Sequence, residues 1–207
     1  MDYPLSFPVP GALVSARWRL VRAQAVSRAP TSFQTQVFDY LGDAWEVEVE
    51  MVEQLGEPHA SAVRAFLLSL DGMVGTFLLG DPSRPSLRGV GGGTPALDGT
   101  HVHRDRTVSI RGLPPSVTGW ALADDWIQLG SGVTARLHKV MADVDSSAAG
   151  TAIDVEIRPG LRHGYEDGSP VTVTGARGIF RLADPTTEWT LRRGPFASIG
   201  FSAIEAL

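Results

Sequence analysis

The sequence predicts a mainly β protein with one core helix, built as a β-sandwich or split barrel plus a second, small antiparallel β-barrel. Residues 45–52 alternate between apolar and acidic side chains, which is typical of a half-buried strand. Residues 63–70 place apolar side chains on one face of a helix. After residue 107, short apolar segments recur between turns rich in Gly, Pro and Asp, a spacing typical of a small barrel or sandwich.

The N-terminal part is expected to form an extended arm followed by three strands. Residues 1–12 contain three prolines, which oppose regular pairing. Strands are predicted at 15–26, 31–40 and 45–52, with Leu41-Gly42-Asp43 as the turn between the last two. In the third strand two sets of side chains point to opposite faces, an apolar set of Trp45, Val47, Val49 and Met51 and an acidic set of Glu46, Glu48 and Glu50.

A helix follows, with Pro58 in its first turn and its end at Asp71-Gly72, where glycine can take the left-handed conformation. Its apolar stripe is expected to cover the apolar face of the third strand and consists of Val63, Phe66, Leu67 and Leu70. A buried strand is predicted at 74–79 and ends at Gly80-Asp81-Pro82. Because Asp71-Gly72 and Gly75 interrupt the apolar run, it falls short of the ~20 residues of a membrane-spanning helix, and no membrane segment is predicted.

The rest of the chain is expected to contain a loop, a barrel and a returning strand. Residues 82–106 are rich in Gly and Pro without periodicity, which indicates a long loop or linker. A small barrel domain is predicted at 107–195, with strands at 107–112, 125–130, 133–144, 151–157, 171–174, 178–183 and 188–192. Residues 196–207 are expected to return as a strand to the first domain, which comprises 13–81 and 196–207.

Composition excludes several classes of function. The net charge of −5 and pI of about 5.5 lack the basic footprint of a nucleic-acid-binding protein. Without cysteine there is no disulfide, thiolate metal site or cysteine nucleophile. The N-terminal residues lack the basic start and apolar core of a signal peptide, so synthesis in a cytoplasm without signal-peptide export is expected.

Three segments of the sequence are candidates for a site of chemistry. His101, His103 and Asp105 would share a face suited to a divalent metal if the segment were extended, but surface or inter-subunit contacts are the preferred interpretation. Glu46, Glu48 and Glu50 could bind a cation, act in acid–base chemistry or line an acidic channel. The preferred interpretation of these glutamates is a solvated strand face paired with Arg17 and Arg19.

The third segment, GVGGGT at residues 89–94, lacks the preceding strand, the following helix and the lysine of a phosphate-binding loop, so a flexible loop is preferred. No nucleophile context surrounds the isolated side chains His138, His163, Ser146, Ser147 and Ser169. No catalytic, cofactor-binding or metal-binding residue is therefore assigned. The expectation is a binding or assembly module, without a cofactor, rather than an enzyme.

Several stretches in a fixed order resemble one family, the distal tail proteins of long-tailed phages and phage-like gene transfer agents. They are QVFDYLGDAWEVEVEM at 36–51, VRAFLLSLDGMVGTFLLGDP at 63–82, DDWIQLGSGVTARLHKVMADVDSSAAGTAIDVEIRPGLR at 124–162, and the ending GFSAIEAL at 200–207. The resemblance covers residues 12–207. Some relatives hold an iron–sulfur centre in a cysteine cluster, and the absence of cysteine here rules out that cofactor.

The resemblance implies a structural virion protein with a tail-tube-like ring-forming domain. Such proteins form a ring, usually a hexamer, that joins the tail tube to the hub or baseplate and leaves a channel for DNA. Further candidate partners are the tape measure protein and peripheral fibre or receptor-binding proteins, and the expected location is the phage tail tip, assembled in the bacterial host cytoplasm. Residues 1–12 and 82–106 are the segments expected to reach neighbouring copies.

Net acidity suits a channel wall from which DNA is repelled, and Glu46, Glu48 and Glu50 are the candidate lumen-facing residues. The alternative function is a carbohydrate-binding β module that contributes to host-surface recognition. In that interpretation the barrel would stack sugars on aromatic faces supplied by Trp120, Trp126 or Trp189. The competing interpretation of the same tryptophans is that they are buried in the core.

Overall fold

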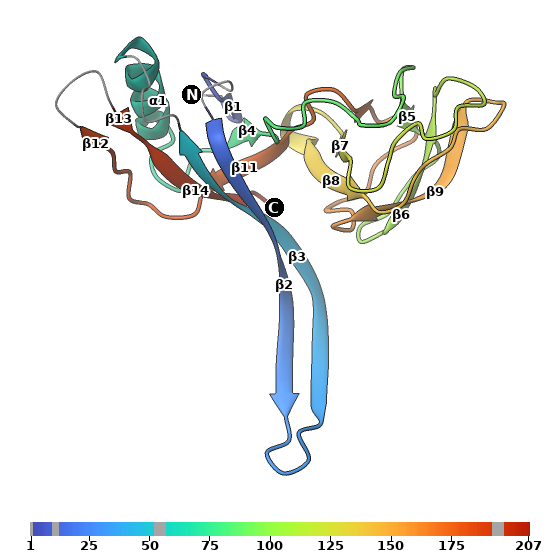
Figure 1. Ribbon diagram of the computed structural model, residues 1–207, viewed down its shortest axis with the longest axis horizontal. Helices are drawn as coiled ribbons and strands as arrows, with labels where there is room; N and C mark the ends of the chain where they lie inside the picture. The colour runs from blue at the N-terminus through green and yellow to red at the C-terminus, as the bar shows by residue number, and fades with distance from the viewer. Residues whose placement is uncertain (1, 10–12, 52–56, 192–196) are drawn as a thin grey trace.

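The computed structural model describes residues 2–9, 13–51, 57–191 and 197–207 (Figure 1). The predicted fold class is confirmed: the described chain is mainly β, with one α-helix and two six-stranded sheets, the second of them nearly closed like a barrel. In Figure 1 the two sheets form separate lobes, and a long hairpin projects from the first.

The first sheet has the strand order β1-β4-β11-β14-β3-β2. Its strands are β1 (Leu5–Ser6), β2 (Leu13–Arg28), β3 (Thr35–Met51), β4 (Phe77–Leu79), β11 (Gly178–Leu182) and β14 (Gly200–Glu205). Within it β1 runs parallel to β4, and the other pairs are antiparallel. A separate two-stranded ribbon joins β12 (Thr190–Leu191) to β13 (Ala197–Ser198).

Helix α1 (Glu57–Ser69) packs on this sheet through one apolar stripe. The stripe and the apolar face of β3 are buried together in one cluster, whose members include Val63, Phe66, Leu67, Leu70, Trp45, Val47, Val49 and Met51. The chain then turns at Asp71 and Gly72, both with positive φ, and β4 begins only at Phe77. The predicted start at Val74 was wrong because residues 71–74 form the turn, which the Gly75 amide closes by donating to the Leu70 carbonyl at 2.7 Å.

The β2–β3 hairpin is a single long ribbon, and the predicted turn at Leu41-Gly42-Asp43 was wrong. In the structure these residues lie within β3, opposite a register shift between Arg22 and Gln24. Leu41 has a φ of 59°, and its amide donates to the Asp39 carboxylate at 2.9 Å. The turn signal therefore marks a β-bulge, which accommodates the extra residues without ending the strand.

The second sheet has the strand order β10-β7-β8-β9-β6-β5. Its strands are β5 (Ala96–Leu97), β6 (Thr107–Arg111), β7 (Trp126–Leu129), β8 (Arg136–Val140), β9 (Thr151–Arg158) and β10 (Val171–Thr172), and a 3₁₀ turn, η2 (Gly132–Thr134), precedes β8. The two outermost strands approach each other because the Leu97 amide donates to the Ser169 carbonyl and the Val171 amide donates to the Pro95 carbonyl. Their approach nearly closes the sheet around a core of its own.

The glycine-rich segment at 89–93 is packed against this barrel rather than free. The Val90 and Gly91 amides donate to the carbonyls of Gly119 and Trp120, and the Trp120 indole donates to the Gly92 carbonyl at 3.1 Å. A Cβ at Gly93 would lie 2.2 Å from the Gly112 carbonyl oxygen. Glycine is needed here for close backbone approach, not for flexibility.

Strand β11 differs from the sequence-based grouping, which placed its residues with the barrel at 107–195. It pairs with β4 on one side and β14 on the other, so it belongs to the first sheet. Its apolar pattern resembles that of the barrel strands around it in the sequence, because both kinds of strand are short and buried. Only its pairing with β4 and β14, which are distant in the sequence, distinguishes β11 from a barrel strand.

None of the helices in the described part of the chain has the length and apolarity needed to cross a membrane.

Replacing Leu67 in the helix stripe should destabilise the fold, because its side chain is 1% exposed and packs against the sheet. We expect Leu67→Ala to lower the free energy of unfolding by about 2–5 kcal/mol, measured by urea denaturation. The matched control is Leu68→Ala on the same helix, which is 56% exposed and should change stability by no more than about 0.5 kcal/mol. Equal losses in the two variants would contradict the packing described.

Candidate functional site

The outer part of the β2–β3 hairpin, residues 22–43, projects from the first lobe, and beyond its base it stands away from both lobes. We call it the arm (Figure 1). None of its described side chains is buried. Large apolar side chains that are 43–65% exposed occur along the arm and at its base, namely Val21, Val26, Phe33, Val37, Phe38, Tyr40 and Leu41. An isolated two-stranded ribbon is only marginally stable in water, and several exposed apolar side chains on one projecting element make it a candidate interaction site.

The arm is held together by cross-strand pairs and a defined tip. Val26 lies opposite Val37, and Ala25 lies opposite Phe38. At the tip the Ala29 amide donates to the Gln34 carbonyl at 2.9 Å. Phe33 has a φ of 56°, and the Arg28 guanidinium stacks 4.9 Å from the centre of its ring. The tip therefore presents a cation and an aromatic ring together.

An aromatic cluster anchors the base of the arm where the two lobes meet. Trp126 of β7 lies 5.0 Å from both Trp18 of β2 and Trp45 of β3, measured between ring centroids. The Trp45 indole donates to the Leu137 carbonyl of β8 at 3.1 Å, and the Trp126 indole donates to the Asp81 carboxylate at 3.1 Å. Side chains of the hairpin are thus packed and hydrogen-bonded directly to the second sheet.

A buried ion network reinforces this junction. Arg162, in the loop after β9, contacts Asp43 at the base of the arm and Glu205 at the end of β14, each at 2.5 Å. Burial alone would lower the pKa of Arg162, but hydrogen bonds and charges from Glu205 and then Asp43 outweigh it and raise the pKa. The Glu205 carboxylate also accepts from the Trp45 amide at 3.1 Å. Three segments remote in sequence are therefore fixed to one another.

His138 lies within the same region and is fully buried. Its Nδ1 is 2.8 Å from the Pro159 carbonyl, so Nδ1 carries the proton and donates. Within the described part of the chain, Nε2 has no hydrogen-bond partner. Burial, opposed by the hydrogen bond to Pro159 and assisted by the nearby charges of Arg162 and Arg136, lowers the pKa of His138 to about 3.

The acidic stripe of β3 forms the cross-strand charge pairs that the sequence favoured. Arg17 lies opposite Glu48 and Arg19 opposite Glu46, with 3.9 Å between the charged atoms in each pair. Glu50 accepts a hydrogen bond from the Ser15 hydroxyl at 3.2 Å. Charge on this face is therefore mixed rather than uniformly acidic.

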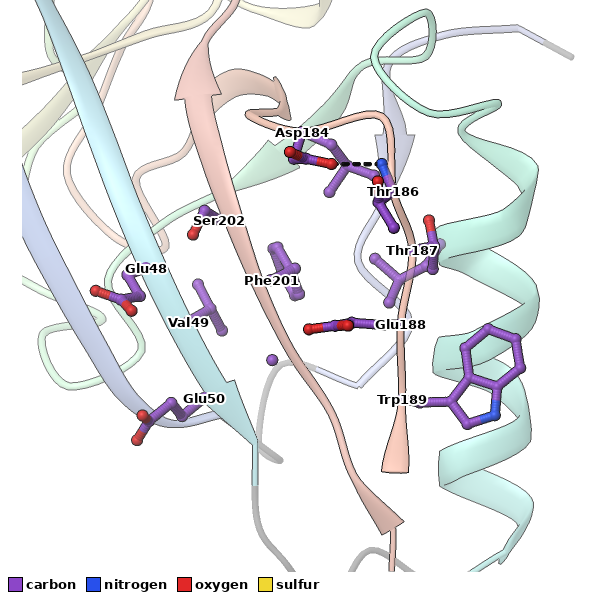
Figure 2. A pocket seen from close by; sticks show the side chains of 13 residues that line it. Glu48, Val49, Glu50, Asp184, Thr186, Thr187, Glu188, Trp189, Phe201 and Ser202 are labelled. Atoms are coloured by element: carbon purple, nitrogen blue, oxygen red, sulfur yellow. Dashed lines mark hydrogen bonds between the residues drawn. The ribbon is translucent and has the colours of Figure 1, made fainter. Parts of the chain in front are cut away.

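A second surface feature is a groove of about 650 Å³ beside β3 and β14 (Figure 2). We call it the acidic groove, and its described lining consists of Glu48, Val49, Glu50, Leu67, Leu182, Asp184, Thr186, Thr187, Glu188, Trp189, Gly200, Phe201 and Ser202. In Figure 2, Glu48 and Glu50 lie on one side and Asp184 and Glu188 on the other, with Phe201 between. The Thr186 amide donates to Asp184, and this bond lowers the pKa of that carboxyl.

The histidine segment considered for metal binding is a turn, so the condition of an extended chain is not met. Asp105 accepts from the Val102 amide at 2.8 Å, and Arg104 has a φ of 74°. The Nε2 atom of His101 accepts from the Ser109 amide at 3.3 Å, while His103 is exposed. Across the described ranges no three His, Cys, Asp or Glu side chains are grouped so that they could hold a metal ion.

The serines considered as nucleophiles form turn contacts. Ser146 donates to the Pro114 carbonyl at 2.5 Å, and Ser169 donates to the Glu166 carbonyl at 2.7 Å. The Ser147 hydroxyl bonds to that of Thr151 at 2.9 Å. None of these bonds links a serine to a histidine base.

Of the three tryptophans proposed to stack on sugars, two are core residues. Trp120 is 0% exposed and Trp126 is 4% exposed. Trp189 is 37% exposed and lines the acidic groove.

A scan against protein-family models finds no match to the chain, and a search of curated proteins finds none either. The interpretation of function therefore rests on the residues and on the structure. Sequence reasoning found the charge pairs and the helix stripe but missed the arm and the Arg162 network. The exposed apolar side chains at 37–41 were the available signal for the arm, and they were interpreted as an ordinary strand.

Removing the Arg162 guanidinium should leave two carboxylates at the junction without their cation. We expect Arg162→Met to lower the free energy of unfolding by about 3–5 kcal/mol at pH 7, measured by urea denaturation. Arg111→Met is the control, since Arg111 pairs with Asp98 and Asp167 at a half-exposed site and should cost at most about 1 kcal/mol. If Arg162→Met is no less stable than the control, the network does not hold the junction.

His138 should make stability fall in mild acid. Between its ordinary pKa of about 6.5 in the unfolded chain and about 3 in the folded chain, only the unfolded state binds the proton. Lowering the pH from 6.5 to 5 should therefore cost about 2 kcal/mol of unfolding free energy. His138→Gln should remove this slope and His103→Gln, at an exposed position, should retain it, as urea titrations at both pH values would show. An unchanged slope in His138→Gln would contradict the assignment.

Proposed function

We propose that this protein is a structural component of a phage virion that forms a hexameric ring at the distal end of the tail. In this role it joins the tail tube to the hub or baseplate and leaves a channel for DNA. The single observation that carries the proposal is the arm, a projecting hairpin whose large apolar side chains remain about half exposed or more. The ordered set of motifs that resembles distal tail proteins specifies the kind of assembly.

The arm suits assembly because it extends well beyond the lobe that bears it. The apolar side chains of the arm contact neither hydrophobic core, so they do not contribute to the packing of a single copy. The edges of its two strands and its apolar groups therefore remain available to another chain. When two different surfaces of identical copies bind each other, every copy can bind a next one in the same way. The copies form a closed ring if the rotation from one copy to the next brings the last copy back to the first. The buried junction at the base would give every copy the same arm direction.

The proposed channel would transmit DNA without retaining it. A net charge of −5 opposes binding of DNA by like-charge repulsion. Arg19 and Arg17 pair with Glu46 and Glu48, so the net charge of the protein, rather than this stripe, is the basis of the proposed repulsion. A non-catalytic role, a location in the virion and contacts with tube, hub, tape measure and peripheral fibre proteins all belong to this proposal.

Polar substitution on the arm should weaken assembly and leave folding intact. We expect the double variant Phe38→Ser, Tyr40→Ser to raise the concentration needed for ring formation by at least about tenfold, since two large apolar side chains leave the interface. The readout is native mass spectrometry across a concentration series, with thermal unfolding as the check on folding.

The matched control is Val133→Ser, Ile153→Ser, which changes two exposed apolar side chains on the second lobe and should assemble as the unaltered protein does. An arm variant that assembles at the unaltered concentration would contradict the proposed role of the arm. An unaltered protein that remains monomeric at every concentration, alone and with tail-tube and hub proteins, would overturn the ring.

A further inference from the structure

The acidic groove and the tip of the arm are complementary in charge and polarity, although they belong to different parts of the chain. We propose that the arm tip of one copy docks in the acidic groove of the next copy. This inference rests on the proposed ring-forming function and names the contact that would build the ring.

The groove combines an apolar floor with acidic walls. Phe201 lies opposite Val49 in the sheet, and these two side chains meet Leu67 of α1 and Leu182 of β11 at the lining. Four carboxylates belong to the lining. Asp184 and Glu188 lie on one side of Phe201, whereas Glu48 and Glu50 lie on the other side with their carboxylates directed away from it, and Glu48 pairs with Arg17. The 13 described lining residues of the groove include no Lys or Arg, and Figure 2 shows Glu188 pointing toward Phe201. Such a groove favours an occupant that carries an apolar group beside a cation.

The arm tip supplies that combination. Phe33 is 65% exposed, and the Arg28 guanidinium already lies over its ring. No carboxylate pairs with Arg28 within the described part of the chain, whereas Arg17 and Arg19, nearer the body, do have such partners. The volume of the groove, about 650 Å³, falls within the range of pockets that hold small ligands, so a phenyl ring and a guanidinium would fit in it. The phenyl ring would contact the floor while the guanidinium donates to the walls.

Docking within one copy is excluded by the direction of the arm. In Figure 1 the tip lies at the bottom of the molecule, whereas α1 and β12, which flank the groove, lie at the upper left. The junction of Arg162 with Asp43 and Glu205 fixes that direction. Since tip and groove are different surfaces, the contact is heterologous, and repetition around an axis yields a ring or an open filament.

Site-directed cross-linking tests the contact directly, because the unaltered chain contains no cysteine. Ser32→Cys places one thiol at the tip, and Glu188→Cys places one in the groove of a copy that carries a mass tag. Under mild oxidation the mixture should yield a disulfide-linked pair containing one copy of each. Ser32→Cys mixed with tagged Glu166→Cys, at an exposed position of the second lobe, should yield at least tenfold less of the mixed pair.

Charge reversal provides the second test. Arg28→Glu and Glu188→Arg should each weaken self-association at least tenfold in sedimentation velocity experiments, and the two changes combined should restore most of it. Arg177→Glu, an exposed arginine outside the groove, should leave association unchanged.

The outcomes separate this contact from the ring itself. If native mass spectrometry shows a closed oligomer but the mixed pair does not form, or only tip-to-tip pairs form, the docking contact is overturned and the proposed function stands. If the mixed pair forms and only open chains are found, the docking contact stands and the ring is overturned. Failure of the combined charge reversal to restore association would contradict the assignment of Arg28 to the groove.

Discussion

The position of the arm depends on one buried interaction, the contact of Arg162 with Asp43 and Glu205. A guanidinium withdrawn from water is tolerated only when its partners are close and well oriented, and here both carboxylates lie at 2.5 Å. The three residues come from the loop after β9, the base of the arm and the last strand of the chain. Their contact therefore joins the second lobe, the hairpin and the first sheet at one point, beside the cluster of Trp18, Trp45 and Trp126.

Because its base is fixed to both lobes, the arm can have a defined direction although a two-stranded ribbon is only marginally stable by itself. A two-stranded ribbon in water has little stability of its own, and the side chains of the arm contribute to neither hydrophobic core. Its strands are nevertheless the outer parts of β2 and β3. The inner end of β3 is buried in the first core, and the apolar side chains of the inner end of β2 are half-buried against that core. The described structure thus combines a rigid body with an exposed apolar extension, and assembly would cover that extension without rearranging either core.

Local pattern was sufficient to predict much of the fold. Alternation located the buried half of β3, the stripe from Val63 to Leu70 located α1, and most barrel strands fall within the predicted ranges, because each signal depends on neighbouring residues. The bulge at Leu41 was misinterpreted, since its residues are those of a turn and the difference lies in pairing with β2. The place of β11 and the partners of Arg162 were not predictable for the same reason: both depend on contacts between residues far apart in the sequence. The glycines at 89–93 indicated flexibility, whereas Gly89 and Gly93 lie so close to the backbone of Trp120 and Gly112 that a side chain would not fit.

The proposed role of the arm is to assemble copies of this chain into a closed ring. Electron microscopy of the purified protein at high concentration, with two-dimensional class averages, examines this most directly. We expect annular particles with an open centre, in which each arm contacts the neighbouring copy. Uniform monomers with free arms, or symmetric dimers joined arm to arm without an annulus, would contradict it.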